Sequence, residues 1–152
     1  MAARRSRLLP WLLAYKALRT PVAFGVNAIV PDERGHILLV RQRYTPGWHM
    51  PGGGVDRGEP PAKAIIRELE EEVGLQSSGA PVLHGLYTRA VGPVSNVVAL
   101  YRVPEAQIAF QPNAEIAEIL WADPAAPPDD ATPATLRRFA ELRGEAASGD
   151  YW

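Results

Sequence analysis

Hydrophobic and polar residues alternate along several short stretches of the chain, and a period of two residues is typical of β-strands. The first such stretch predicts a strand over 22–30, and the apolar run at 36–43 predicts a second. Proline, aspartate and glycine in the segment between them favour a reversal, so we expect these two strands to pair as a β-hairpin. Further strands are expected near 81–90, 95–103 and 115–121.

Two later segments have the character of amphipathic helices. We expect the first over 60–73, because proline is accepted in an opening turn and Gly74 provides a C-terminal cap. The second is expected over 132–143, where a threonine precedes a proline. Residues 44–58 are rich in glycine and proline and predict a loop, with a short strand near 48–50. This order of strands and helices indicates an α/β or α+β sandwich.

The composition is that of a globular chain with one domain. It has 152 residues, of which 47% are hydrophobic and 22% are charged, so a packed core is feasible. Cysteine is absent, which excludes disulfide scaffolds, cysteine-ligated zinc and thiol nucleophiles. The three histidines are widely spaced and offer no recognisable metal site. A net charge of −1 argues against binding to nucleic acid through bulk positive charge.

Charge is unevenly placed along the chain. Five of the 16 basic residues lie within residues 1–19, whereas all 17 acidic residues follow from Asp32 onward. The basic segment is rich in leucine and predicts a helix that packs on the domain or on a second subunit, as in a homodimer. Contact with an anionic membrane surface is a weaker alternative.

We expect a cytoplasmic protein, because the N-terminal segment is a poor secretory signal. Lys16 interrupts its apolar stretch, and no small-residue cleavage site follows before the first predicted strand. No apolar run reaches the ~20 residues that a membrane span needs. At the other end, residues 146–152 are expected to form a small, mostly polar tail.

Three glutamates share one face of the helix predicted over 60–73. At about 100° per residue, Glu71 and Glu72 lie within roughly 60° of Glu68. They border the apolar arc that would face the core, which contains Ala62, Ile65, Ile66, Leu69 and Val73. A hard divalent cation would relieve the repulsion between the three carboxylates, because oxygen ligands suit Mg²⁺ and Mn²⁺. A solvated acidic helix face is the simpler alternative.

Gly52, Gly53 and Gly54 precede this helix. Glycines let backbone N–H groups approach an anion closely, so these three are candidate phosphate-binding positions, with a plain tight turn as the alternative. Arg41 and Arg43, at the end of the second predicted strand, are further candidates for phosphate contacts, although such arginines are often only solvated. Three aromatic residues are candidates for stacking on a base: Tyr44, Trp48 and Tyr87.

Several of these residues belong to one longer pattern. Gly53 is followed after five residues by Glu59, and after seven more by Arg67-Glu68-Leu69-x-Glu71-Glu72-x-Gly74-Leu75. This pattern resembles the Nudix box of the Nudix (MutT-like) hydrolases at every fixed position. The resemblance covers residues 53–75 directly, and the flanking predicted elements are compatible with a Nudix domain over 20–145.

The resemblance implies a fold, a cofactor and residue roles. Nudix hydrolases are α/β/α sandwiches with a mixed sheet, their box forms a loop–helix–loop, and they need Mg²⁺ or Mn²⁺. The metal-binding carboxylates would be Glu68, Glu71 and Glu72. Arg67 would orient these glutamates through a salt bridge, and Glu59 would support the loop and the cation network. Gly53 would permit the loop conformation near the phosphates, and Gly74 would end the helix.

The resemblance also implies a reaction. Nudix enzymes hydrolyse a diphosphate linkage in a nucleoside diphosphate attached to another moiety, through attack of water on phosphorus. A general base must accept the proton of that water, and Glu68 is a candidate within the box. Glu115 and Glu118 are candidates downstream, of which we favour Glu115 because it ends a predicted loop. We therefore expect a nucleotide substrate that the motif does not identify. A Nudix-like domain that senses a nucleotide without cleaving it is the alternative.

Overall fold

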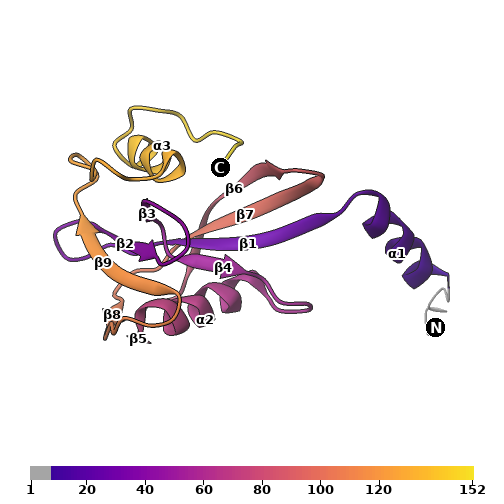
Figure 1. The fold of residues 1–152 in the computed structure, drawn as a ribbon, viewed down its shortest axis with the longest axis horizontal. Coiled ribbons are helices and arrows are strands. Elements are labelled where there is room, and N and C mark those ends of the chain that lie inside the picture. The colour runs from indigo at the N-terminus through magenta and orange to yellow at the C-terminus, as the bar shows by residue number, and fades with distance from the viewer. Residues whose placement is uncertain (1–7) are drawn as a thin grey trace.

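Strand β1 (Val22–Ile29) lies inside the sheet that organises the molecule, which a computed structural model describes over residues 8–152 (Figure 1). It pairs antiparallel with β4 (Gly52–Gly54) on one side and parallel with β7 (Val94–Arg102) on the other. Strand β6 (Val82–Val91) completes the sheet in the order β4-β1-β7-β6. The mixed sheet expected from the sequence is thus confirmed.

The expected hairpin between β1 and β2 (Ile37–Gln42) is wrong. The turn itself closes, because the Asp32 N–H donates to the His36 carbonyl at 2.9 Å. Beyond the turn the strands separate, and β2 pairs with β3 (Trp48–His49) and β9 (Ile116–Ala122) in a second sheet of three strands. Strand β1 already has β4 and β7 on its two edges, so β2 has no free edge of β1 to join.

Helices cover both sides of the sheet strands, α2 (Pro61–Val73) on one and α3 (Pro133–Leu142) on the other (Figure 1). The buried apolar residues of α2 are Ala64, Ile65, Leu69 and Val73, which pack in a core with Val26 and Ala28 of β1. Phe139 of α3 packs in a second core with Ile29 and Leu100. This arrangement confirms the α/β/α sandwich, and each side of the sheet has its own apolar core.

Most predicted elements agree with the structure to within two residues, and the turn chemistry explains their ends. Thr132 caps α3, since its hydroxyl oxygen accepts a hydrogen bond from the Thr135 N–H at 3.3 Å. Gly74 ends α2 in the left-handed region with φ of 68°. The segment expected to be a loop, 44–58, contains β3 as predicted and also β4, which was not predicted. A small sheet of β5 (Leu75–Ser77) and β8 (Gln107–Ile108) follows α2.

The basic N-terminal segment forms α1 (Leu9–Arg19), which extends away from the sandwich (Figure 1). None of its residues is buried, so the expectation that it packs on its own domain is wrong. Its packing on a second subunit stays a prediction, and residues 1–7 lie outside the described part of the chain. No helix within residues 8–152 is both long enough and apolar enough to cross a membrane.

The tail 146–152 lies along the edge of β6. The Thr88 N–H donates to the Asp150 carbonyl at 2.7 Å, and the Trp152 N–H donates to the Thr88 carbonyl at 3.1 Å. The Trp152 ring meets the ring of buried Tyr87 edge to face, with 5.7 Å between their centroids. The tail is therefore anchored by both backbone and side-chain contacts.

The conformation of Gly74 gives a prediction for stability. A Cβ at this position would lie 2.5 Å from the Ala109 carbonyl oxygen, in a backbone conformation that side chains disfavour. We expect Gly74→Ala to lower the free energy of unfolding by about 3 kcal/mol, from overpacking together with backbone strain. Gly35→Ala is the control, because Gly35 also has positive φ but open space around it, and it should cost about 1 kcal/mol. Denaturant unfolding measures both, and equal losses would contradict the steric argument.

Candidate active site

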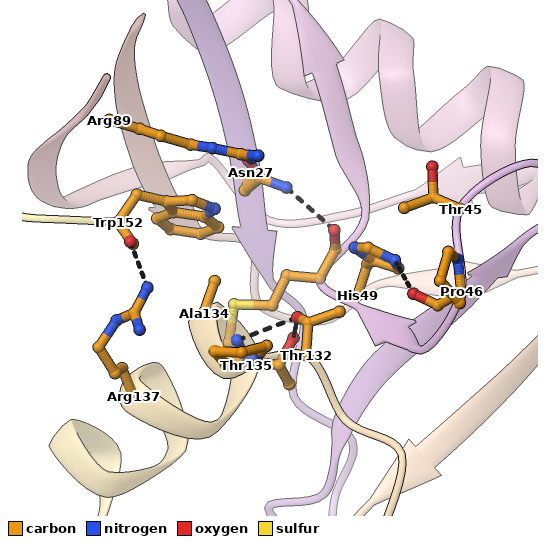
Figure 2. A pocket seen from close by; sticks show the side chains of 12 residues that line it. Asn27, Thr45, Pro46, His49, Arg89, Thr132, Ala134, Thr135, Arg137 and Trp152 are labelled. Atoms are coloured by element: carbon orange, nitrogen blue, oxygen red, sulfur yellow. Dashed lines mark hydrogen bonds between the residues drawn. The ribbon is translucent and has the colours of Figure 1, made fainter. Parts of the chain in front are cut away.

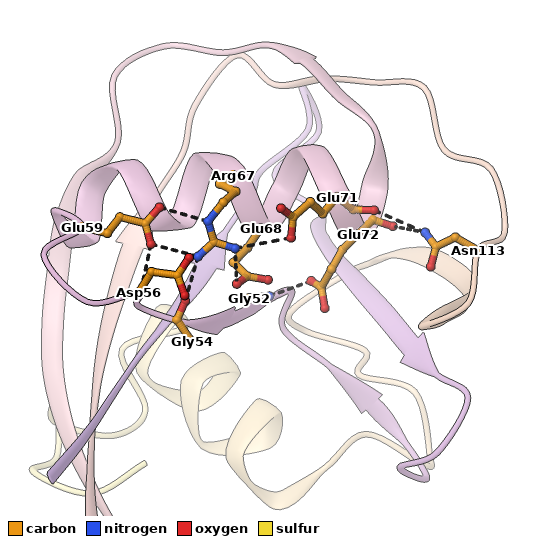
Figure 3. Close-up of polar contacts among 9 residues, drawn as sticks. All are labelled: Gly52, Gly54, Asp56, Glu59, Arg67, Glu68, Glu71, Glu72 and Asn113. Atoms are coloured by element: carbon orange, nitrogen blue, oxygen red, sulfur yellow. Dashed lines mark hydrogen bonds and ion pairs between the residues drawn. The ribbon is translucent and has the colours of Figure 1, made fainter.

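Helix α2 holds a buried carboxylate on its acidic face (Figure 3). Glu72 is only 4% exposed, and its Oε2 accepts a hydrogen bond from the Gly52 N–H at 2.8 Å. Burial raises the pKa of Glu72 to about 8, and the charges of Glu68, Glu115 and Glu71 add to the shift. A carboxylate that is both buried and surrounded by like charge lacks a positive partner.

Arg67 links this helix to the glycine strand (Figure 3). Its guanidinium donates to both oxygens of Glu59, at 3.0 and 2.9 Å, and to the Gly54 carbonyl at 2.9 Å. It also donates to Glu68 at 2.8 Å and to Glu71 at 3.3 Å. The hydrogen bonds from Arg67 lower the pKa of Glu59 to about 2. Glu59, Arg67, Glu68 and Glu71 therefore form one network, and Glu72 lies outside it.

Glu68 is held directly behind the glycine strand. Its side chain is 13% exposed, and burial raises its pKa even though Arg67 opposes the shift. A Cβ on Gly53 would lie 2.5 Å from the Glu68 carboxylate, so only glycine leaves room for this carboxylate. Gly52 has φ of 146° and a Cβ there would overlap the Val26 carbonyl. The close approach of β1 and α2 to β4 thus favours glycine at positions 52 and 53, respectively.

The box carboxylates suit a hard divalent cation by their chemistry. Glu68, Glu71 and Glu72 supply only oxygen donors, and burial raises the pKa values of Glu68 and Glu72. Within residues 8–152, no three acidic or histidine side chains already converge closely enough to enclose a cation. Arg67 instead provides the positive charge beside Glu68 and Glu71. Glu71 is 60% exposed and contacts Arg67 at 3.3 Å.

Asn113 positions the loop that carries Glu115. Its side-chain N–H donates to the Glu72 carbonyl at 3.0 Å, while its oxygen accepts the N–H groups of Glu115 and Ile116 at 3.0 and 2.8 Å. Arg43 supports the same loop by donating to the Asn113 carbonyl at 2.6 Å. The loop is therefore tied to the end of α2, and the charge of Glu115 contributes to the raised pKa values of Glu68 and Glu72.

Arg41 and Glu118 lie apart from the glutamate cluster. Arg41 pairs with Asp130 at 2.9 Å and with Glu118 at 3.7 Å, and its guanidinium stacks on the buried Trp48 ring at 4.3 Å. With Arg43 and Tyr44 it lines a cavity separate from the glycines. The structure therefore does not bring Arg41 or Arg43 to the glycine strand. Trp48 and Tyr87 are core residues, so they are not available for base stacking.

Two cavities lie on the α3 side of the sheet. One of about 390 Å³ is formed by the segment before β4, the start of α3 and the tail (Figure 2). The other, of about 300 Å³, runs along β1 to Gly53 and Gly54. Asn27, Arg89 and Trp152 line both cavities, so the two form one groove. Of the predicted phosphate-binding positions, Gly53 and Gly54 line this groove, whereas the Gly52 N–H is already bonded to Glu72.

Comparison with known proteins assigns the family. A family model described as the NUDIX domain matches residues 21–142. The chain belongs to the Nudix family. Its fold also matches solved Nudix structures, such as a MutT NUDIX hydrolase from Burkholderia pseudomallei with a TM-score of 0.70. That match has 23% sequence identity and covers 80% of this chain and 98% of the other.

The curated relatives match this chain over only part of their own length. An RNA pyrophosphohydrolase of Rhodospirillum rubrum is 39% identical over 59 residues, which are 38% of this chain and 36% of that protein. A putative 8-oxo-dGTP diphosphatase of Bacillus subtilis is 40% identical over 65 residues, which are 43% of each chain. The matched stretches thus span less than half of either relative.

Several residues of the Nudix site have no signal in the sequence. Asn113 precedes the acidic pair that was singled out, yet only the fold places its amide against the end of α2. Asn27 and Arg89 lie on strands whose pairing was not foreseen, and they meet only because β1 and β6 flank β7. Trp152 is an aromatic residue in a tail that was expected to be small and mostly polar. Each of these residues depends on a long-range contact.

Burial of Glu72 gives a prediction for pH dependence in the metal-free protein. Its pKa of about 8 exceeds the unfolded value of 4.5, so its contribution to stability is present below pH 4.5 and is lost as pH rises through 8. Glu72→Gln removes this loss and can still accept the Gly52 N–H. With a chelator present, we expect its stability relative to the wild type to increase by on the order of 2–4 kcal/mol between pH 5 and 9.

The exposed Glu70 on the same helix provides the matched control. Glu70→Gln should run parallel to the wild type across this pH range in denaturant unfolding experiments. If the Glu72→Gln curve were parallel as well, the buried carboxylate would not be the source of the pH dependence.

Proposed function

We propose that this chain is a divalent-metal-dependent pyrophosphohydrolase that cleaves a diphosphate linkage in a nucleotide. The observation that carries the proposal is a pair of carboxylates, Glu68 and Glu72, that are held against the glycine strand and whose pKa values are raised by burial. Such an arrangement is costly for folding unless a cation or an anionic substrate with its cation uses it. Membership of the Nudix family supports the same reaction class.

Glu68, Glu71 and Glu72 would hold Mg²⁺ or Mn²⁺. Bound there, the cation would withdraw charge from the phosphoryl group and offset the repulsion between the carboxylates and a diphosphate. Arg67 keeps Glu68 oriented through its 2.8 Å contact, and Glu59 holds Arg67 in place with two hydrogen bonds. These residues act as a positioning frame that restricts the movement of Glu68.

Attack by water on phosphorus requires a proton acceptor, and three carboxylates are candidates, namely Glu68, Glu115 and Glu118. Glu115 stands on the loop that Asn113 fixes to α2, and its charge acts on both Glu68 and Glu72. Glu118 faces Arg41 across the β2–β9 pair and is already neutralised there. We therefore assign the general base to Glu115, with Glu68 as the second candidate.

The substrate class is proposed from the groove and from the relatives together. The groove on the α3 side is large enough for a nucleoside, and it reaches the glycine strand in front of Glu68. Relatives named RNA pyrophosphohydrolase and putative 8-oxo-dGTP diphosphatase support nucleotide 5′-triphosphates, free or at an RNA end. Nucleoside triphosphates are thus the first substrates to test.

A substrate panel tests the proposed reaction. It contains nucleoside triphosphates, 8-oxo-dGTP, a 5′-triphosphorylated RNA oligonucleotide, ADP-ribose, nucleotide sugars and dinucleoside polyphosphates, each with Mg²⁺ and with Mn²⁺. We expect release of phosphate or pyrophosphate with at least one class, and a loss of about 100-fold or more in kcat for Glu72→Gln. Glu70→Gln should retain activity, because Glu70 points to solvent on the same helix.

Full metal-dependent turnover by Glu72→Gln would refute the proposed metal site. Absence of turnover on every member of the panel, with nucleotide binding retained in calorimetry, would favour the alternative of a Nudix-like nucleotide sensor. Chelation by EDTA should abolish turnover and restoring Mg²⁺ should recover it.

Two adjacent glycines provide a sharper test of how the carboxylate is positioned. Gly53→Ala places a methyl group where the Glu68 carboxylate lies, at 2.5 Å, whereas Gly54→Ala meets nothing within 4 Å. Neither glycine has a φ in the left-handed region. We expect Gly53→Ala to lower kcat by about 10–100-fold through displacement of Glu68, and Gly54→Ala to stay within about two-fold. Steady-state kinetics with the best substrate measure this, and equal effects of the two variants would contradict it.

A further inference from the structure

The tail brings one aromatic side chain into the groove. Trp152 lines both the cavity against α3 and the cavity along β1, and Figure 2 shows its indole on the same wall as Arg89 and Asn27. The other aromatic candidates do not occupy this position, because Trp48 and Tyr87 are buried in the core and Tyr44 lies beside the glutamates. Trp152 therefore lines both cavities of the groove, whereas Phe24 lines only the cavity along β1.

Contacts behind Trp152 fix the orientation of its ring. The Tyr87 ring meets it at 5.7 Å with an interplanar angle of 67°, and the Arg138 guanidinium lies 5.3 Å from its centroid. Its backbone is held by Thr88 on β6, and its carbonyl accepts a hydrogen bond from Arg137 of α3. A ring that is supported on one side and partly exposed on the other offers its free surface to a flat ligand without loss of rotamer freedom.

Polar groups next to this ring suit the rest of a nucleoside. Asn27 donates its side-chain N–H to the Met50 carbonyl at 2.9 Å, which leaves its amide oxygen as an acceptor at the groove wall. Arg89 is exposed and lines both cavities, so it supplies donors for base or sugar oxygens. Strand β4 is the edge strand of its sheet, so no further strand lies beyond it. A chain of phosphates attached to a nucleoside in the groove can therefore pass this edge toward the carboxylates of α2.

We propose that Trp152 is a substrate-binding residue, and that the heteroaromatic base of a nucleotide stacks on its indole within the groove lined by Asn27 and Arg89. The proposal rests on the proposed function for the direction in which the phosphates extend. The tail would then contribute a residue to the substrate-binding site in addition to its contacts with β6. Stacking on an aromatic side chain accounts for roughly a 5–100-fold gain in affinity per base, so removal of the indole has a measurable effect.

The test uses the full chain, nucleoside monophosphates as probes that cannot be hydrolysed at a diphosphate, and ribose 5-phosphate as the matched probe without a base. We expect at least one of AMP, GMP, CMP and UMP to bind the wild type more tightly than ribose 5-phosphate in calorimetry and to quench tryptophan fluorescence. Trp152→Leu, which keeps apolar volume without a π-face, should weaken that nucleotide by about 10-fold and leave ribose 5-phosphate within two-fold. Trp152→Phe should retain most of the affinity and lose most of the quenching.

Tyr151→Ala is the control variant, because Tyr151 belongs to the same tail, is 71% exposed and lines neither cavity of the groove. It should bind all probes as the wild type does, and thermal unfolding checks that the variants are folded. The proposal is overturned if Trp152→Leu binds the nucleotide within two-fold of the wild type, if it weakens nucleotide and ribose 5-phosphate equally, or if no base improves binding over ribose 5-phosphate.

The two proposals fail in distinguishable ways. If binding depended on the base and on Trp152 but no diphosphate of the panel were hydrolysed, the stacking site would stand. The proposed enzymatic activity would then be refuted. If Glu72→Gln lost turnover while Trp152→Leu left KM unchanged, the proposed enzymatic activity would stand and the proposed stacking site would be refuted.

Discussion

The guanidinium of Arg67 is the contact on which the geometry of the acidic site depends. It spans the space between α2 and the glycine strand, where it bonds Glu59, the Gly54 carbonyl and Glu68. Without this positive charge, Glu68 and Glu71 would repel each other with no counter-charge beside them, and α2 would lose one of its hydrogen bonds to β4. The positions of Glu59, Glu68 and Glu71 therefore depend on one side chain.

Much of α2 could be predicted from the sequence because its information is local. The helical period places the glutamates beside the apolar arc, and the structure gives the same faces, with Leu69 and Val73 buried and Glu70 exposed. Burial of Glu72 goes further than the period implies, since Glu72 lies under Gly52 of β4. That contact depends on β4, and three glycines have too little strand propensity to predict it.

The remaining errors share a physical cause, which is that strand pairing is decided by competition between distant segments. The turn at 31–35 forms as its residues dictate, yet its two strands join different sheets. Arg41 at the end of β2 illustrates the same dependence on distant segments, because its ion-pair partner Asp130 lies far along the chain. Trp152 had no pattern around it, and only the hydrogen bonds between the tail and Thr88 determine what its ring faces.

The parallel pairing of β1 with β7 also constrains the order in which the protein can assemble. Val26 finds its partner in Ala99, and the strands at the centre of the sheet are therefore far apart along the chain. A contact of such long range has a high loop-closure cost, which is typical of slow folding. Helix α2 is synthesised before β7. The glutamates on α2 therefore precede the strand that pairs with β1 and completes the centre of the sheet. The groove in turn needs the contacts between residues 150–152 and Thr88 of β6, which are also distant along the chain.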